Sequence, residues 1–237
     1  MKRISWVLIP IMMILAGCGV FPGSISKRVI QHAAPELKMD NSYFESLGCF
    51  NDLACLPENL RNLEYPIDYI NKPSDMLAGL DPSLPLAVAN TNGFSAEDEL
   101  PSVYVKSCMI QQYVRYLVLV NGEIHLIDSQ DKLAALYAPI ESENEALSFA
   151  VAATGLTAVY NLHESSNLKW YADTLEETYV TQTGEGYRVH LFDTFLCGCG
   201  PHVVRSVDLM VSKDGTLTFS EAIDAYSDPE MDGLCID

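Results

Sequence analysis

The chain has 237 residues, of which 49% are hydrophobic and 19% are charged, and its formal net charge is −18 at neutral pH. This apolar content is typical of a folded globular body and excludes a disordered stalk. The 32 acidic residues against 14 basic ones disfavour nucleic acid as a partner, because an acidic surface and a phosphate backbone repel each other.

The first eighteen residues have the layout of an export signal. Lys2 and Arg3 provide a positive start, and residues 4–15 form an apolar run that only Ser5 interrupts with a polar side chain. This run is too short to cross a bilayer as a stable helix, and small residues follow it before Cys18. The pattern predicts a signal peptide over residues 1–17.

The end of this signal, Leu15-Ala16-Gly17-Cys18, resembles the lipobox of bacterial lipoproteins. The resemblance implies cleavage after Gly17 and acylation of Cys18, which would anchor the protein to a lipid bilayer of the cell envelope, facing the periplasm or the exterior. Several acyl chains hold a protein durably, because each buried methylene contributes about 0.8 kcal/mol. The competing interpretation is an ordinary secreted protein in which Cys18 forms a disulfide. It is disfavoured because general signal peptides prefer a small residue where Leu15 stands.

The remaining chain divides into three predicted parts. Residues 18–40 are predicted to be the lipidated cysteine and a flexible tether. Gly, Pro and Ser recur in them, and their apolar residues follow neither a helical nor a strand period. Residues 41–100 read as a loop-rich lobe with one or two short helices. Its prolines argue against long helices and central strands, and they stand at Pro57, Pro66, Pro73, Pro82 and Pro85. Residues 101–237 carry the regular patterns of an α+β domain.

Local signals within that domain are clear. The pair Asn121-Gly122 separates two β-rich runs and predicts a hairpin, because both turn residues must accept positive φ. A short helix is predicted over residues 130–137. A longer helix over residues 142–154 begins with a capping box of Ser142 and Glu145 and is apolar nearly all round, which indicates burial on most sides.

The C-terminal part reads as an antiparallel meander, with strands predicted over residues 178–183, 187–196, 203–211 and 217–219. The predicted fold class is therefore α+β, with one buried helix packed against a curved antiparallel sheet. This order of elements is similar to that of PepSY-like and cystatin-like domains. The resemblance concerns element order only and implies no activity.

Six cysteines besides Cys18 predict a disulfide-stapled domain, because an even count in an exported chain favours three bridges. Cys49 and Cys55 form the natural local pair. Cys197 and Cys199 stand too close for an unstrained bridge, so they pair with Cys108 and Cys235 in either order.

The segment Cys197-Gly-Cys199-Gly-Pro-His202 allows a second interpretation. Two thiolates and an imidazole within six residues form a candidate copper or zinc site, or a thiol-redox centre. The usual Cys-x-x-Cys spacing of zinc and redox motifs is absent, however, and the glycines are explained by a bulge or tight turn.

No hydrolase motif or phosphate-binding loop occurs in the chain. The function predicted from sequence is a non-catalytic binding, inhibitory or envelope-assembly module without a cofactor, with an envelope protein or peptide as partner. The binding surface would be the sheet face or the proline-rich lobe. The alternative is a metal-binding or thiol-redox protein centred on Cys197, Cys199 and His202.

Overall fold

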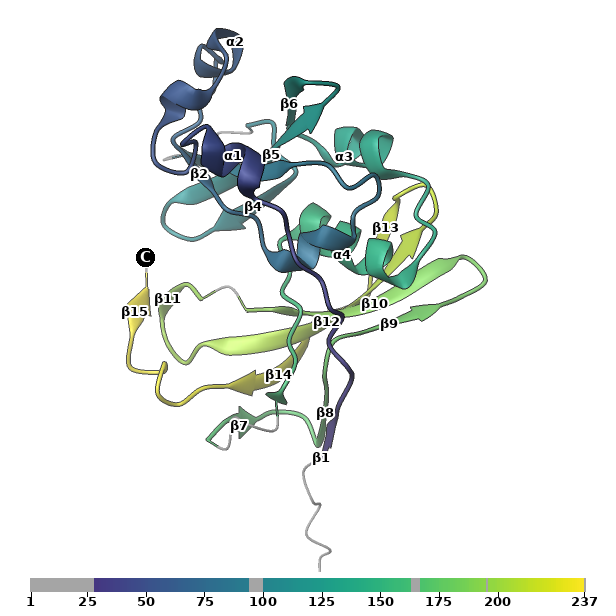
Figure 1. The fold of residues 1–237 in the computed structure, drawn as a ribbon. Coiled ribbons are helices and arrows are strands. Elements are labelled where there is room, and N and C mark those ends of the chain that lie inside the picture. Colours follow the sequence, from purple (N-terminus) through teal and green to yellow (C-terminus); the bar gives the residue numbers. More distant parts are fainter. Residues whose placement is uncertain (1–27, 94–99, 163–166, 195, 237) are drawn as a thin grey trace, which may run out of the picture.

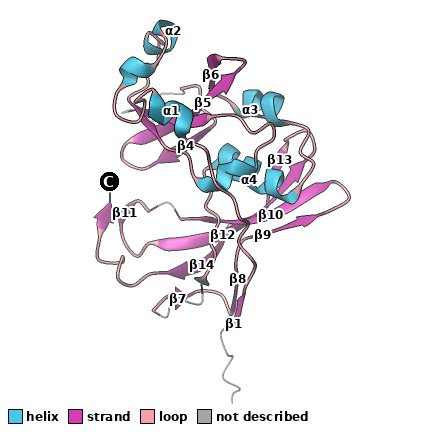
Figure 2. Cartoon of the chain, in the orientation of Figure 1, coloured by secondary structure: helices cyan, strands magenta, loops and turns pink. Residues whose placement is uncertain are grey.

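The structure is a computed structural model that describes residues 28–93, 100–162, 167–194 and 196–236. Two antiparallel sheets enclose helix α4 (Glu143–Thr154), as Figures 1 and 2 show. The predicted α+β class, with one buried helix against a curved antiparallel sheet, is confirmed. The helix is apolar nearly all round because a second sheet covers its other side.

The first sheet has the strand order β2-β3-β5-β4, and β6 also pairs with β5. The predicted hairpin is confirmed: Val120 of β5 pairs with Glu123 of β6, and φ is 51° at Asn121 and 87° at Gly122. The strands of this sheet are β2 (Tyr69–Asn71), β3 (Leu86–Gly93), β4 (Tyr104–Ser107), β5 (Gln111–Val120) and β6 (Glu123–Ile127).

The second sheet has the order β7-β14-β12-β10-β9, with β13 also paired to β12. Its strands are β7 (Lys169–Trp170), β9 (Tyr179–Gln182), β10 (Gly186–Asp193), β12 (Val203–Ser212), β13 (Leu217–Phe219) and β14 (Ile223–Ser227). The predicted C-terminal meander is therefore present. Two small ladders complete the strands, β1 (Arg28–Ile30) with β8 (Thr174–Glu176) and β11 (Gly198–Cys199) with β15 (Cys235–Ile236).

Helix α4 has the predicted ends. Ser142 Oγ accepts a hydrogen bond from the Glu145 N–H at 3.2 Å, and the Glu145 carboxylate accepts one from the Glu141 N–H at 2.8 Å. Gly155 ends the helix with φ of 69°. Between these caps the helix packs on both sheets, and the Tyr116 hydroxyl of β5 donates to the Ala152 carbonyl at 2.8 Å. The predicted short helix α3 (Gln130–Tyr137) lies beside it.

The N-terminal lobe covers the outer face of the first sheet. It contains two short helices, as predicted, α1 (Ser42–Ser46) and α2 (Glu58–Arg61), and the 3₁₀ turns η1 (Leu53–Cys55) and η2 (Asp75–Gly79). Phe44 and Leu60 of the lobe pack in one cluster with Ala87, Ala89 and Leu117 of the sheet. The first sheet is thus buried on both faces over much of its length.

Three expectations for the N-terminal half are wrong. Residues 41–100 do contain a central strand, because β3 pairs with both β2 and β5, and the first sheet crosses the predicted boundary at residue 100. The prolines do not interrupt β3 because Pro85 stands directly before it. The flexible tether does not extend to residue 40, since residues 28–30 pair in parallel with β8.

This N-terminal strand is held at several points. The Arg28 N–H donates to the Asp173 carbonyl at 3.2 Å, and the His32 N–H donates to the Glu177 carboxylate at 3.0 Å. Further along, the Met39 N–H donates to Asp75 Oδ1 at 3.0 Å. Cys18 and the predicted signal peptide lie outside the described residues. Within the described part of the chain, no helix combines the length and apolarity needed to span a membrane.

Candidate functional site

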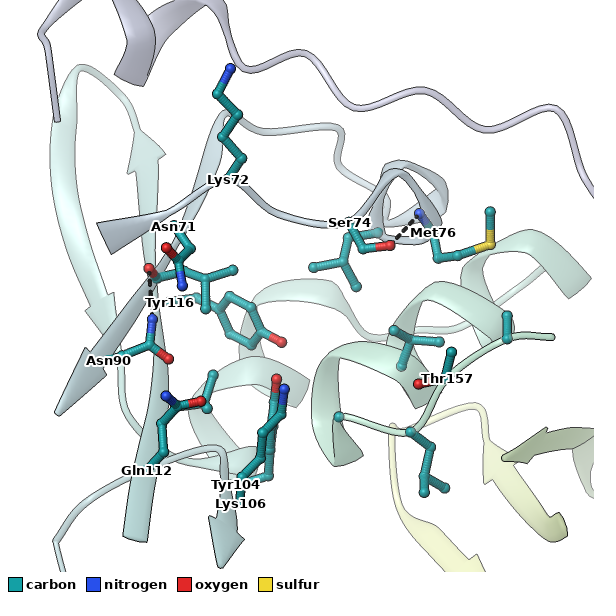
Figure 3. Close-up of a pocket in the computed structure, with 17 residues that line it drawn as sticks. Asn71, Lys72, Ser74, Met76, Asn90, Tyr104, Lys106, Gln112, Tyr116 and Thr157 are labelled. Atoms are coloured by element: carbon teal, nitrogen blue, oxygen red, sulfur yellow. Dashed lines mark hydrogen bonds between the residues drawn. The ribbon is translucent and has the colours of Figure 1, made fainter. Parts of the chain in front are cut away.

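A cleft of about 320 Å³ lies between the inner face of the first sheet, the turn η2 and the segment 155–158 that follows α4 (Figure 3). The cleft exists because strands β3 and β5 continue beyond the C-terminal end of α4. Alternate residues of one strand share a face, so β5 presents Tyr116 and Val114 and then Gln112 along the same side. The neighbouring strand β3 likewise changes from Val88 to Asn90.

Gly155 sets the place where the helix stops covering the sheet. A Cβ atom at this residue would stand 2.3 Å from the Tyr104 ring, so the ring packs directly on the glycine backbone. The left-handed φ of 69° then turns the chain into the segment that forms the opposite wall of the cleft. Tyr104 and Leu156 therefore form one end of the cleft.

The sheet wall is rich in amide side chains. Asn71, Asn90 and Gln112 point into the cleft from three adjacent strands (Figure 3). Asn90 is 2% exposed, and its Nδ2 makes a long 3.5 Å contact with the Val88 carbonyl. The Gln112 amide donates to the Tyr69 hydroxyl. Such a wall offers donors and acceptors to a polar ligand.

The charge of the cleft is opposite to that of the whole chain. Among its described lining residues no carboxylate occurs, whereas two lysines do. Lys72 forms an ion pair with Glu45 and points away from the cleft in Figure 3. Lys106 lies directly across from Gln112 in the β4–β5 pairing, and no carboxylate within the described ranges forms an ion pair with it. Among the described lining residues, Lys106 is thus the lysine without an ion pair.

The tyrosines of the cleft are held neutral. Burial raises the pKa of Tyr104, and burial together with the neighbouring Tyr104 raises the pKa of Tyr116 well above its usual value. A neutral phenol can donate or accept a hydrogen bond but is a poor base at neutral pH. The two neutral phenols are therefore available for hydrogen bonds with a polar group.

A second cavity of about 380 Å³ adjoins the cleft on the other side of Tyr104 and Leu156, which line both. It is more apolar, and its wall includes Val207 of β12 and Phe219 of β13. Phe219 is 52% exposed. We refer to this cavity as the apolar groove.

A histidine–carboxylate pair lies elsewhere, on the second sheet. His190 Nδ1 is 2.6 Å from Asp208 Oδ1, the two residues are cross-strand partners, and Arg188 also pairs with Asp208. Burial, the largest single influence, would raise the pKa of Asp208, but hydrogen bonds from Arg188 and His190 outweigh it and lower the value. The Tyr179 ring stacks on His190, and His190 Nε2 is buried. Because that nitrogen is buried, the imidazole does not present it to a ligand in this structure.

The cysteines predicted to form disulfides do so. The bridges are Cys49–Cys55, Cys108–Cys197 and Cys199–Cys235, which includes the predicted local pair and resolves the two open orders. The second bridge joins the loop after β4 to the loop after β10 and so connects the two sheets.

The residues that the structure describes assemble no donor set for the hypothesised metal or redox centre. The sulfurs of Cys197 and Cys199 are both in disulfides, and the His202 Nε2 is 3.1 Å from the Leu234 carbonyl. Within the described residues, no three His, Cys, Asp or Glu side chains are grouped as metal ligands would be. Cys18, the predicted lipidation site, lies outside the described residues.

Sequence reasoning missed the cleft residues Asn90, Lys106 and Gln112. One signal was available: the apolar run of β3 ends at Ala89, and amides follow at positions 90 and 92, where a fully buried strand would carry aliphatic residues. No protein-family model matches the chain, and no curated protein or solved structure shows significant similarity to it.

Proposed function

We propose that the protein is a lipid-anchored, non-catalytic binding module of the bacterial cell envelope, and that its cleft binds a small polar ligand bearing a carboxylate. The anchor rests on the lipobox resemblance at Cys18. The ligand class rests on one observation: in a chain of net charge −18, the described lining of the cleft lacks carboxylates and presents Lys106.

The surrounding groups suit this ligand. A lysine ammonium provides a charge-assisted hydrogen bond to a carboxylate, and the facing amides satisfy the remaining polar groups of the ligand. The cleft wall takes Asn71, Asn90 and Gln112 from strands β2, β3 and β5 of the first sheet, and Ser74 lies at the start of η2. The adjoining apolar groove leaves room for an apolar substituent next to Tyr104.

Replacement of Cys18 by Ser tests the anchor. A serine cannot take the thioether-linked lipid, so the variant should move from the membrane fraction to the soluble envelope fraction, whereas the wild-type protein stays with the membranes. Fractionation followed by immunoblotting measures this. A Cys18→Ser protein that remained in the membrane fraction would remove the basis for the anchor.

Replacement of Lys106 by Gln tests the cleft. The probes are matched pairs that differ by one carboxylate: D-glucuronate with D-glucose, and N-acetylalanine with its amide. A ligand that binds only the folded state stabilises it by about 2.7 kcal/mol at a hundredfold excess over Kd, which raises Tm by about 5–10 °C in a chain of this size. We expect at least one of the two carboxylate probes to raise the Tm of the wild-type ectodomain, which is the chain after Cys18. The Lys106→Gln variant should not show that shift.

The matched control is Lys132→Gln, because Lys132 is an exposed lysine that pairs with Asp128 at 2.7 Å and does not line the cleft. It should keep the full shift in Tm. Equal shifts with charged and neutral probes, no shift with any probe, or an undiminished shift in Lys106→Gln would each contradict the assigned ligand class.

A further inference from the structure

At one end of the molecule, Arg28, the first described residue, lies near exposed aromatic and basic side chains. Strands β1, β7 and β8 lie together at the end opposite α2 (Figure 1). We call the residues Lys169, Trp170 and Tyr171, together with Arg28, the tip.

The path of the chain brings the predicted anchor to the tip. Arg28 pairs with Thr174 in the β1–β8 register, and its N–H donates to the Asp173 carbonyl at 3.2 Å. Cys18 precedes Arg28 by ten residues, a length of chain that reaches at most about 35 Å when fully extended. A bilayer that holds Cys18 must therefore lie within that distance of the tip.

The side chains of the tip have the chemistry of a membrane interface. Tyr171 is 39% exposed, and the Lys169 Nζ is 5.0 Å from the centroid of its ring. Trp170 is half-buried against the small core cluster beneath it. Within the described residues, neither Lys169 nor Arg28 forms an ion pair with a carboxylate. Acidic residues stand nearby in the sequence: Asp173 precedes Thr174, the partner of Arg28, and Asp228 follows Ser227, the partner of Lys169.

We infer that the tip rests on the lipid headgroups of the membrane that anchors the protein. Tryptophan and tyrosine favour the bilayer interface because one part of the ring system is apolar and another part hydrogen-bonds. Each nearby basic residue adds about 1 kcal/mol at an anionic surface. This orientation rests on the proposed acylation of Cys18, and it directs the α1–α2 lobe away from the bilayer.

The fluorescence of Trp170 tests the contact directly. The chain has two tryptophans, and Trp6 lies in the predicted signal peptide, so Trp170 is the single tryptophan after cleavage. The mature chain, residues 18–237, is coupled through the Cys18 thiol to a maleimide phospholipid in phosphatidylcholine vesicles that contain phosphatidylglycerol. We expect a blue shift on coupling and a severalfold loss of intensity when the lipids carry bromine on their acyl chains.

Two variants provide the controls. The double change Lys169→Glu and Tyr171→Ser should reduce both the blue shift and the quenching. Moving the reporter to the lobe, with Tyr65→Trp in a Trp170→Phe background, should give no quenching, since Tyr65 is exposed near α2. Circular dichroism checks that each variant is folded.

Unchanged emission on coupling would overturn the inference, and so would a blue shift without bromine quenching, which indicates contact between protein copies instead. Because the coupling is chemical, this outcome does not depend on whether cells acylate Cys18. Failure of the membrane contact is therefore distinguishable from failure of the anchor, which the fractionation of Cys18→Ser measures.

Discussion

Replacing Ala150 with Asp is expected to unfold the protein. Ala150 has no exposed surface and lies in the middle of α4, in the cluster that includes Tyr116 of the first sheet and Val189 of the second. A carboxyl group there has no room and no partner. Even if it takes up a proton and is buried neutral, a polar group without a hydrogen bond costs several kcal/mol. The whole stability of a domain is about 5–15 kcal/mol. Near-UV circular dichroism and thermal unfolding of the purified protein measure the effect.

The matched control places the same carboxylate on the same helix. Asn144→Asp puts it at an exposed position in the first turn of α4, where a negative charge is favourable because of the helix dipole. This variant should unfold at the wild-type temperature or slightly above it. A soluble Ala150→Asp protein with a native near-UV spectrum would show that α4 is not enclosed by the two sheets.

Replacing Arg115 with Met should lower the free energy of unfolding by about 2–4 kcal/mol. Arg115 is 3% exposed on β5, and burial lowers the pKa of its guanidinium. Its side chain donates to the Tyr65 carbonyl at 3.1 Å, to the Pro66 carbonyl at 3.3 Å and to the Thr91 hydroxyl. Hydrogen bonds from charged donors contribute about 1.5–3 kcal/mol each, but removing a buried charge recovers part of the loss.

Urea unfolding measures this change, with a lower midpoint and an unchanged slope as the expected result. The control is Arg188→Met, which removes an exposed arginine whose ion pair with Asp208 is at the surface and is worth at most about 1 kcal/mol. If Arg115→Met were as stable as the wild-type protein, Arg115 would not be what holds the lobe segment at Tyr65 and Pro66 to the sheet.

The elements predicted correctly are those that local chemistry specifies. Helix α4 follows from Ser142, Glu145 and Gly155, which satisfy its terminal backbone groups within a few residues. The β5–β6 hairpin follows from Asn121-Gly122, whose backbone preferences determine the turn. Both signals act over short stretches of chain and are therefore visible in a single sequence.

The elements missed depend on pairing between distant segments. The strand β1 exists because Arg28 meets Thr174, and no local pattern in residues 28–30 indicates that parallel partner. In β3, Asn90 faces the cleft beyond the end of α4, so the strand carries polar residues where a core pattern was expected. The cleft itself joins Asn90, Lys106 and Thr157 only through the tertiary fold.

The bridge between Cys108 and Cys197 has a consequence for how strongly the cleft can bind. Cys108 stands two residues after Lys106, so this covalent link fixes the strand that carries the lysine to the second sheet. A rim restrained in this way is already preorganised, and a ligand that enters it loses less affinity to the ordering of the protein. Formation of this disulfide would thus preorganise the proposed binding site as well as connect the two sheets.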